Sequence, residues 1–173
     1  MEENEIMEEM PPRLDVSMGI KKWYVIVTLN IQEVEGGYTC ERVAAILDNY
    51  PTRSDVVKMV NDYINAKTDE KILSGFVWRD NPVWLSSENQ FNFKCAYDLA
   101  YQTGGQSLPA KYKLGEDADG NPIYFNFTDL ATFQDFYLGC VGWIQRCINE
   151  GWVEKDSVDY DEIIPKSRED EDE

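Results

Sequence analysis

Positions 20–31 have the two-residue period of a β-strand, with apolar residues at every second position of one face, from Trp23 to Ile31. Tyr24, Ile26 and Thr28 lie on the other face, so both faces are expected to be at least partly covered. Gly36 and Gly37 follow, and two glycines can adopt the positive φ values of a tight hairpin turn. A return strand is therefore expected over about 38–47. The pattern predicts an antiparallel hairpin at the start of the folded part of the chain.

After the hairpin the period changes to that of a helix. Apolar residues recur every three or four positions between Arg53 and Ala66, as on the buried face of an amphipathic helix. Thr52 is placed to cap this helix, and Asp55 lies favourably in its first turn. A third strand is expected over 71–79. Positions 20–79 are thus predicted to form a β-β-α-β lobe, in which one helix covers a sheet.

The polar tripeptide Asp80-Asn81-Pro82 separates this lobe from a second one, which is expected over 83–158. Ser87 and Gln90 have the spacing of a capping box, which opens a helix that runs to about Thr103. Two glycines come directly after it, and glycine tolerates the left-handed conformation of a helix end. The seam is predicted to be exposed and turn-like.

Short strands at 109–114 and 123–128 flank a polar turn. Thr128 is predicted to cap a long helix with apolar residues at helical spacing, and this helix ends either at Gly151 or at Asp156. The second lobe is therefore predicted as α-β-β-α. The predicted fold class is α+β, a small antiparallel sheet lobe followed by a lobe with a long C-terminal helix.

Both ends of the chain are acidic. The net charge of −17 divides into −5 for residues 1–19, −7 for 154–173 and −5 for all the residues between. The two ends hold too few apolar residues to offset the entropy cost of ordering. We therefore predict acidic disordered arms at 1–19 and 159–173.

Charge and hydropathy disfavour two classes of partner. A nucleic-acid-binding protein needs a basic stripe, and the nearest thing to a basic cluster is Lys21-Lys22. The sequence has no run of 18 apolar residues, and its acidic first residues lack the apolar core of a secretory signal. Direct binding to nucleic acid and to a membrane is not expected.

The sequence contains no histidine. That absence removes the serine and cysteine triads that need an imidazole base, and most hydrolytic zinc sites. Four scattered cysteines contain no C-x-x-C pair and are interpreted as small buried hydrophobes: Cys40, Cys95, Cys140 and Cys147. Neither an enzymatic activity nor a cofactor is expected.

The segment Asp117–Asn121 begins like a calcium-binding loop. Pro122 stands where such a loop has its glycine, and Thr128 stands where it has its terminal glutamate. A polar hairpin turn is therefore the preferred interpretation, and no metal site is predicted.

Aromatic residues are abundant, with five Trp, ten Tyr and seven Phe. Trp and Tyr bury a large area at low entropy cost and keep a polar group, so they are favoured at protein interfaces. Five of them flank the seam or lie on the helices of the second lobe, and we take these as candidates for partner binding: Trp78, Trp84, Tyr97, Tyr101 and Trp152. Core packing is the alternative for each, and Trp78 and Trp84 would then join the two lobes.

Four phrases of the second lobe carry a family resemblance: Val-Trp-Leu-Ser-Ser-Glu-Asn-Gln-Phe from Val83, Leu-Pro-Ala-Lys-Tyr-Lys-Leu from Leu108, Phe-Thr-Asp-Leu-Ala-Thr-Phe from Phe127 and Trp-Ile-Gln-Arg-Cys from Trp143. In this order they resemble an uncharacterised domain of tail, tail-fibre and virion-associated proteins of phages and prophages, those of gut Bacteroidales in particular. The resemblance covers about 84–159. It brings no catalytic residues with it.

The resemblance implies a structural component of a phage particle, in the tail, the head–tail connector or the fibre attachment region. Its partners would be other phage structural proteins in a multi-subunit ring or tail assembly. It would be located in the virion, after assembly in the bacterial host cytoplasm. The alternative is an assembly chaperone for tail or tail-fibre proteins that is not retained in the virion, which acidic ends would also suit. An enzyme of unknown type is the least favoured interpretation.

Overall fold

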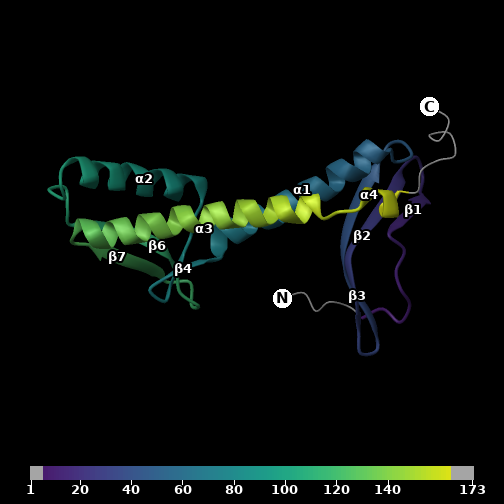
Figure 1. Ribbon diagram of the computed structural model, residues 1–173, viewed down its shortest axis with the longest axis horizontal. Coiled ribbons are helices and arrows are strands. Elements are labelled where there is room, and N and C mark those ends of the chain that lie inside the picture. Colours follow the sequence, from purple (N-terminus) through teal and green to yellow (C-terminus); the bar gives the residue numbers. More distant parts are fainter. Residues whose placement is uncertain (1–5, 165–173) are drawn as a thin grey trace. The chain divides into compact units, whose positions relative to one another are not determined.

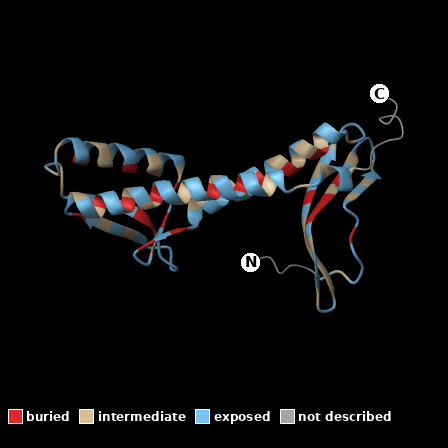
Figure 2. Ribbon diagram, viewed as in Figure 1, coloured by how far each residue is buried: buried red, intermediate tan, exposed pale blue. Residues whose placement is uncertain are grey.

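The computed structural model describes residues 6–164 (Figure 1). The fold is α+β, with small antiparallel sheets and a long C-terminal helix, as the sequence predicts. The described residues divide into two compact units, one holding 6–64 with 154–164 and the other holding 65–153. Each unit has its own buried core (Figure 2). The division falls within two helices and not at the predicted seam.

The first unit contains a three-stranded antiparallel sheet in the order β1-β2-β3, formed by Leu14–Met18, Trp23–Val34 and Gly37–Leu47. The predicted hairpin turn between β2 and β3 is confirmed, because Gly36 and Gly37 have φ values of 95° and 148°. Helix α1 (Arg53–Ser74) begins in this unit. The core of this unit is formed by residues of the sheet, of α1 and of the C-terminal segment: Val27, Leu29, Val43, Val56, Val60, Ile64 and Ile163.

Thr52 and Asp55 cap α1 reciprocally, as predicted. The Thr52 hydroxyl accepts a hydrogen bond from the Asp55 amide at 3.2 Å, and the Asp55 carboxylate accepts one from the Thr52 amide at 2.9 Å. Two of the amides that a helix start leaves without partners are satisfied in this way. The helix therefore begins where the local sequence places it.

Both terminal arms are more ordered than predicted. Leu14–Met18 was expected in a disordered arm, but it forms strand β1 and pairs with β2 from Leu14 opposite Val27 to Met18 opposite Trp23. At the other end, the short helix α4 (Tyr160–Ile163) places Ile163 in the core with 4% of its surface exposed. Pairing with a sheet edge and burial of one side chain outweigh the acidic composition of these segments. The remainder of both predicted arms, 1–5 and 165–173, lies outside the described residues.

The predicted third strand over 71–79 is wrong in its first half. Helix α1 continues to Ser74, and only Phe76–Trp78 forms a strand, β4, which pairs with β5 (Asn81–Val83). The apolar residues after position 71 satisfy a helix face as well as a strand, and helical packing decides between them. The tripeptide 80–82 is consequently part of a tight β-hairpin and not a linker between lobes.

The second unit packs helix α2 (Ser87–Gln102) and helix α3 (Leu130–Asp156) with the hairpin of β6 (Ala110–Glu116) and β7 (Pro122–Phe127) (Figure 1). The predicted order of elements is confirmed, and α3 takes the longer of the two predicted lengths. The caps shift by one residue. Ser86, not Ser87, accepts from the Asn89 amide, and Asp129, not Thr128, accepts from the Thr132 amide.

The core of this second unit is aromatic. Four phenylalanines are almost completely buried and contact one another: Phe93, Phe127, Phe133 and Phe136. Phe127 and Phe133 stack with ring centroids 4.4 Å apart, which joins the end of β7 to the start of α3. This packing gives the unit a rigid frame on which exposed side chains can be held.

The cysteines differ from one another. Cys140 and Cys147 are buried, as predicted, and burial raises the pKa of the Cys140 thiol to about 12. Cys40 is half-buried. Cys95 is exposed on α2, which corrects its assignment as a buried hydrophobe. It lies two positions after the buried Phe93, and residues two apart on a helix point in different directions.

Within the described part of the chain, no helix combines the length and the hydropathy that crossing a membrane requires.

Candidate docking surface

The turn between β4 and β5 has an unusual backbone. Arg79 and Asp80 have φ values of 48° and 63°, in the left-handed region that residues other than glycine rarely adopt. Two consecutive residues of this kind form the turn type that matches the twist of a two-residue hairpin. The Asn81 side chain supports it by donating to the carbonyl oxygens of Trp78 at 3.4 Å and Arg79 at 2.8 Å.

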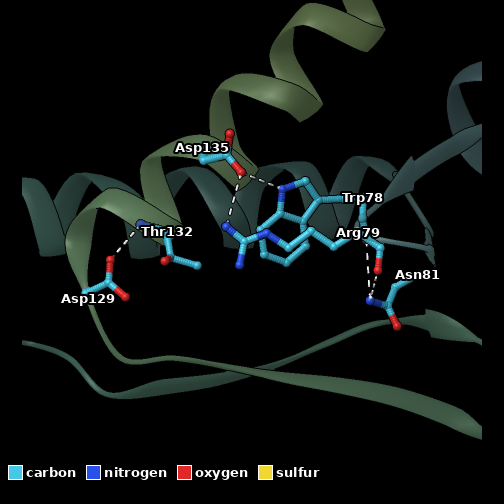
Figure 3. A network of polar contacts seen from close by, with 6 residues as sticks. All are labelled: Trp78, Arg79, Asn81, Asp129, Thr132 and Asp135. Carbon is cyan, nitrogen blue, oxygen red and sulfur yellow. Dashed lines mark hydrogen bonds and ion pairs between the residues drawn. The ribbon is translucent and has the colours of Figure 1, made fainter.

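Trp78 is held in place through contacts of its ring and of its indole nitrogen (Figure 3). Its indole Nε1 donates a hydrogen bond to Asp135 Oδ2 at 3.0 Å. The Arg79 guanidinium lies over the Trp78 ring, 4.5 Å from the centroid, and is 3.6 Å from the same carboxylate oxygen. The indole also meets Phe125 and Phe136 edge-on. A tryptophan, a guanidinium and a carboxylate thus form one closed arrangement.

Trp78 is therefore not available for partner binding, which corrects its place among the candidates. Only 6% of its surface is exposed. It packs in the core of the second unit and does not join two lobes. The sequence could not distinguish Trp78 from Trp84, since one lies just before the polar turn and the other just after it.

Trp84 lies six positions later in an exposed groove. Trp84 is 49% exposed, although its backbone is hydrogen-bonded on both sides. The Trp84 amide donates to the Leu114 carbonyl at 2.7 Å, and the Asn89 side chain donates to the Trp84 carbonyl at 2.8 Å. A large side chain that is exposed on a fixed backbone costs little further entropy when a partner covers it.

The groove beside Trp84 has a volume of about 510 Å³, and we call it the Trp84 groove. Three apolar residues line it: Pro82, Val83 and Leu114. Three charged residues also line it: Glu88, Lys113 and Glu116. The groove lies entirely within the second unit, between β5, the start of α2 and the end of β6.

Gly115 lines the Trp84 groove where β6 passes close to the backbone of β5. A Cβ atom at this position would lie 2.5 Å from the Pro82 carbonyl oxygen. The Pro82 backbone could make room for that atom only if β5 moved away from β6. Glycine is therefore needed here for close approach of two strands and not for an unusual φ.

The charged residues of the Trp84 groove differ in whether they have an ion-pair or hydrogen-bond partner. Lys113 Nζ forms an ion pair with Glu116 Oε1 at 2.7 Å, and both side chains are about half exposed. Among residues 6–164, no side chain forms an ion pair or a hydrogen bond with the Glu88 carboxylate. Sequence reasoning missed all three, because charged residues are common in this chain and their meeting depends on the crossing of β5, β6 and α2.

The other three candidates lie elsewhere. Tyr97 is half-buried and stacks on Tyr137 of α3, with centroids 4.5 Å apart and planes 15° apart. Tyr101 is 64% exposed, near the end of α2, roughly 20 Å along the helix from its start beside the groove. Trp152 is 57% exposed near the end of α3. The five predicted residues do not form one surface: Trp84 lines the Trp84 groove, and the other four do not.

The Asp117–Asn121 segment is the turn of the β6–β7 hairpin, as predicted. Asp117 Oδ1 accepts hydrogen bonds from the amides of Asp119 at 2.9 Å and Asn121 at 2.8 Å. The hydrogen bond from the Asn121 amide contributes most to holding the pKa of the Asp117 carboxyl below its usual value. The carboxylate is used to close the turn on itself.

No protein-family model, curated protein or solved structure matches this chain.

Proposed function

We propose that this protein is a non-enzymatic structural subunit of a phage particle, and that it binds a neighbouring subunit through the Trp84 groove. The exposed indole of Trp84 on a fixed backbone is the observation that carries the proposal. Interface tryptophans in well-formed grooves supply a disproportionate share of binding energy.

The setting of the groove supports binding more than chemistry. The groove is lined by Trp84, three aliphatic residues, the Lys113–Glu116 ion pair and Glu88, and its remaining lining residues are Ser74, Ser86, Asn89 and Gly115. Among residues 6–164 the Glu88 carboxylate has no side-chain partner. The phage part of the proposal comes from the phrases between 84 and 159 that resemble virion-associated proteins. Trp84 and Glu88 both belong to the first of those phrases.

Quantitative mass spectrometry of purified particles tests the proposal. Particles from cells that express the tagged full-length chain are expected to hold it at a stoichiometric level relative to the other structural proteins. Trp84→Ala is expected to reduce incorporation at least tenfold, as the loss of about 2 kcal/mol of binding energy implies. Tyr101→Ala is the matched control, because it removes an aromatic side chain of similar exposure away from the groove.

Two outcomes contradict the proposal. A chain that is needed for particle formation but absent from the particles would be an assembly chaperone. Equal incorporation of the wild-type chain and Trp84→Ala would show that the groove is not the interface.

A further inference from the structure

We propose that the Trp84 groove takes an arginine side chain of the partner. The inference rests on the proposed docking function and adds the chemistry of the partner's contact residue.

Trp78, elsewhere in the same chain, shows which groups bind a tryptophan side chain in this protein. Trp78 has a guanidinium over its ring at 4.5 Å and a carboxylate that binds both the indole nitrogen and that guanidinium. The three groups satisfy one another, since the ring face attracts a cation and the carboxylate accepts from its N–H groups. Figure 3 shows this arrangement around Asp135.

The Trp84 groove holds two of these three groups. Trp84 supplies an exposed ring, and Glu88 and Glu116 supply carboxylates that line the same groove. In the described part of the chain, no lysine or arginine lies over the Trp84 ring. Lys113, the one cation of the lining, is already paired with Glu116. The missing component is a cation.

The shape and floor of the groove favour an arginine. Its planar guanidinium stacks on an aromatic face and donates two parallel hydrogen bonds to a carboxylate. The long apolar stem of the side chain would lie on Pro82, Val83 and Leu114. Glu88 needs no existing contact to be broken. The Lys113–Glu116 pair is exposed, so releasing Glu116 would cost little.

Charge at the scale of the second unit acts in the same direction. The second unit, which carries the groove, has 11 acidic and 7 basic residues over 65–153, so its own field attracts basic surfaces and repels acidic ones. A partner that approaches the groove with an arginine meets complementary charge both at long range and in contact.

The test uses the full chain with its tryptophan indole N–H groups labelled with ¹⁵N. Two capped tripeptides are titrated, one with arginine between two glycines and one with citrulline, which has the same shape without the charge. The arginine peptide is expected to shift the Trp84 resonance and to bind at least tenfold more tightly than the citrulline peptide. That ratio should fall as salt is raised.

Two substitutions separate the groove from general electrostatics. Glu88→Gln is expected to weaken binding of the arginine peptide at least threefold. Asp98→Asn removes the same charge further along α2, ten positions or roughly 15 Å from Glu88 and outside the groove lining. It should change binding by less than about 1.5-fold, as expected for a screened charge at that distance. Trp84→Phe keeps a ring in place and is expected to retain weak binding, which peptide-induced shifts of neighbouring amides would report.

Equal binding of the two peptides would overturn the inference, as would equal effects of Glu88→Gln and Asp98→Asn. A methyl glucoside that shifts the Trp84 resonance when neither peptide does would assign the groove to sugars instead. If the arginine peptide binds as expected while the chain is absent from particles, the inference stands and the proposed function fails. The two are therefore distinguishable.

Discussion

Trp78 and Asp135 are 57 positions apart in the chain and share a hydrogen bond of 3.0 Å between the indole nitrogen and a carboxylate oxygen. The bond joins the β4–β5 hairpin to helix α3 and satisfies the one polar group of a buried indole. It also explains why two tryptophans around one short hairpin have different roles. Trp78 stabilises the second unit, and Trp84 is left on its surface.

Alanine substitution should separate these two roles. Trp78→Ala is expected to lower the stability of the protein by about 3–5 kcal/mol, since it removes a buried ring and the hydrogen bond from the indole nitrogen to Asp135. Trp84→Ala is expected to cost less than about 1 kcal/mol, as is usual for an exposed side chain. Thermal unfolding followed by circular dichroism measures both. Similar losses for the two variants would show that Trp84 is also a packing residue.

Two glycines of α3 form a matched pair. Gly142 has open space where a Cβ would lie, so Gly142→Ala should stabilise the helix by about 0.5–1 kcal/mol. Gly151 is buried, and its Cβ would lie 2.5 Å from the Thr68 hydroxyl of α1. Gly151→Ala is therefore expected to destabilise the protein by about 1–3 kcal/mol. Denaturant unfolding of both variants gives the sign directly, and a rise in stability for both would mean that Thr68 turns aside freely.

Stability at low pH should depend on Asp129. Its carboxylate accepts from the Thr132 amide at 2.8 Å, and this bond, the largest cause, lowers the pKa of Asp129 from 3.8. A pKa that is lower in the folded state stabilises the protein above the unfolded value, and the effect is lost as pH falls through the folded value. Asp129→Ala should thus lower the melting temperature at pH 7, with a deficit that shrinks below about pH 3.8.

Asp129→Asn is the control, because asparagine also caps a helix start but does not titrate. It should keep most of the melting temperature at pH 7 and should lack the part of the acid transition that Asp129 contributes. A deficit of Asp129→Ala that is the same at pH 7 and pH 3 would contradict the prediction.

Because both ends contribute ordered elements, removing them should lower the melting temperature. Relative to a chain that spans 6–164, a chain that spans 20–158 loses strand β1 and the buried Ile163. Burial of an isoleucine alone contributes about 1.5–3 kcal/mol, so the shorter chain should melt at a clearly lower temperature. Limited proteolysis of the full chain should accordingly leave 14–18 and 160–163 uncut. Equal melting temperatures of the two truncated chains would show that neither end supports the sheet.

Thiol labelling should follow the burial of the cysteines. Cys95 is exposed and is expected to react with iodoacetamide in the native protein within the time that a free thiol needs. Cys140 should react only on unfolding, because it is buried and its pKa of about 12 leaves almost no thiolate at neutral pH. Peptide mass spectrometry after timed labelling identifies each site. Rapid labelling of Cys140 would indicate that α3 opens readily.

The sequence by itself determined the features that depend on near neighbours in the chain. The Gly36-Gly37 turn, the start of α1 at Thr52 and the succession of α2, β6, β7 and α3 each rest on local backbone preference or on a hydrophobic period of a few residues. Helix caps were predicted to within one residue for the same reason. Such features are encoded within one or two turns of chain.

Only the tertiary structure decided which segments and side chains find distant partners. The acidic arms contain β1 and α4 because the edge of β2 and the core beside Ile64 were there to receive them. Trp78 is buried and Trp84 exposed because Asp135 reaches one indole, while β6 holds only the backbone of the other. Burial and strand pairing depend on contacts between residues that are far apart in the chain. The composition of a segment does not record these contacts, so it cannot separate a buried tryptophan from an exposed one.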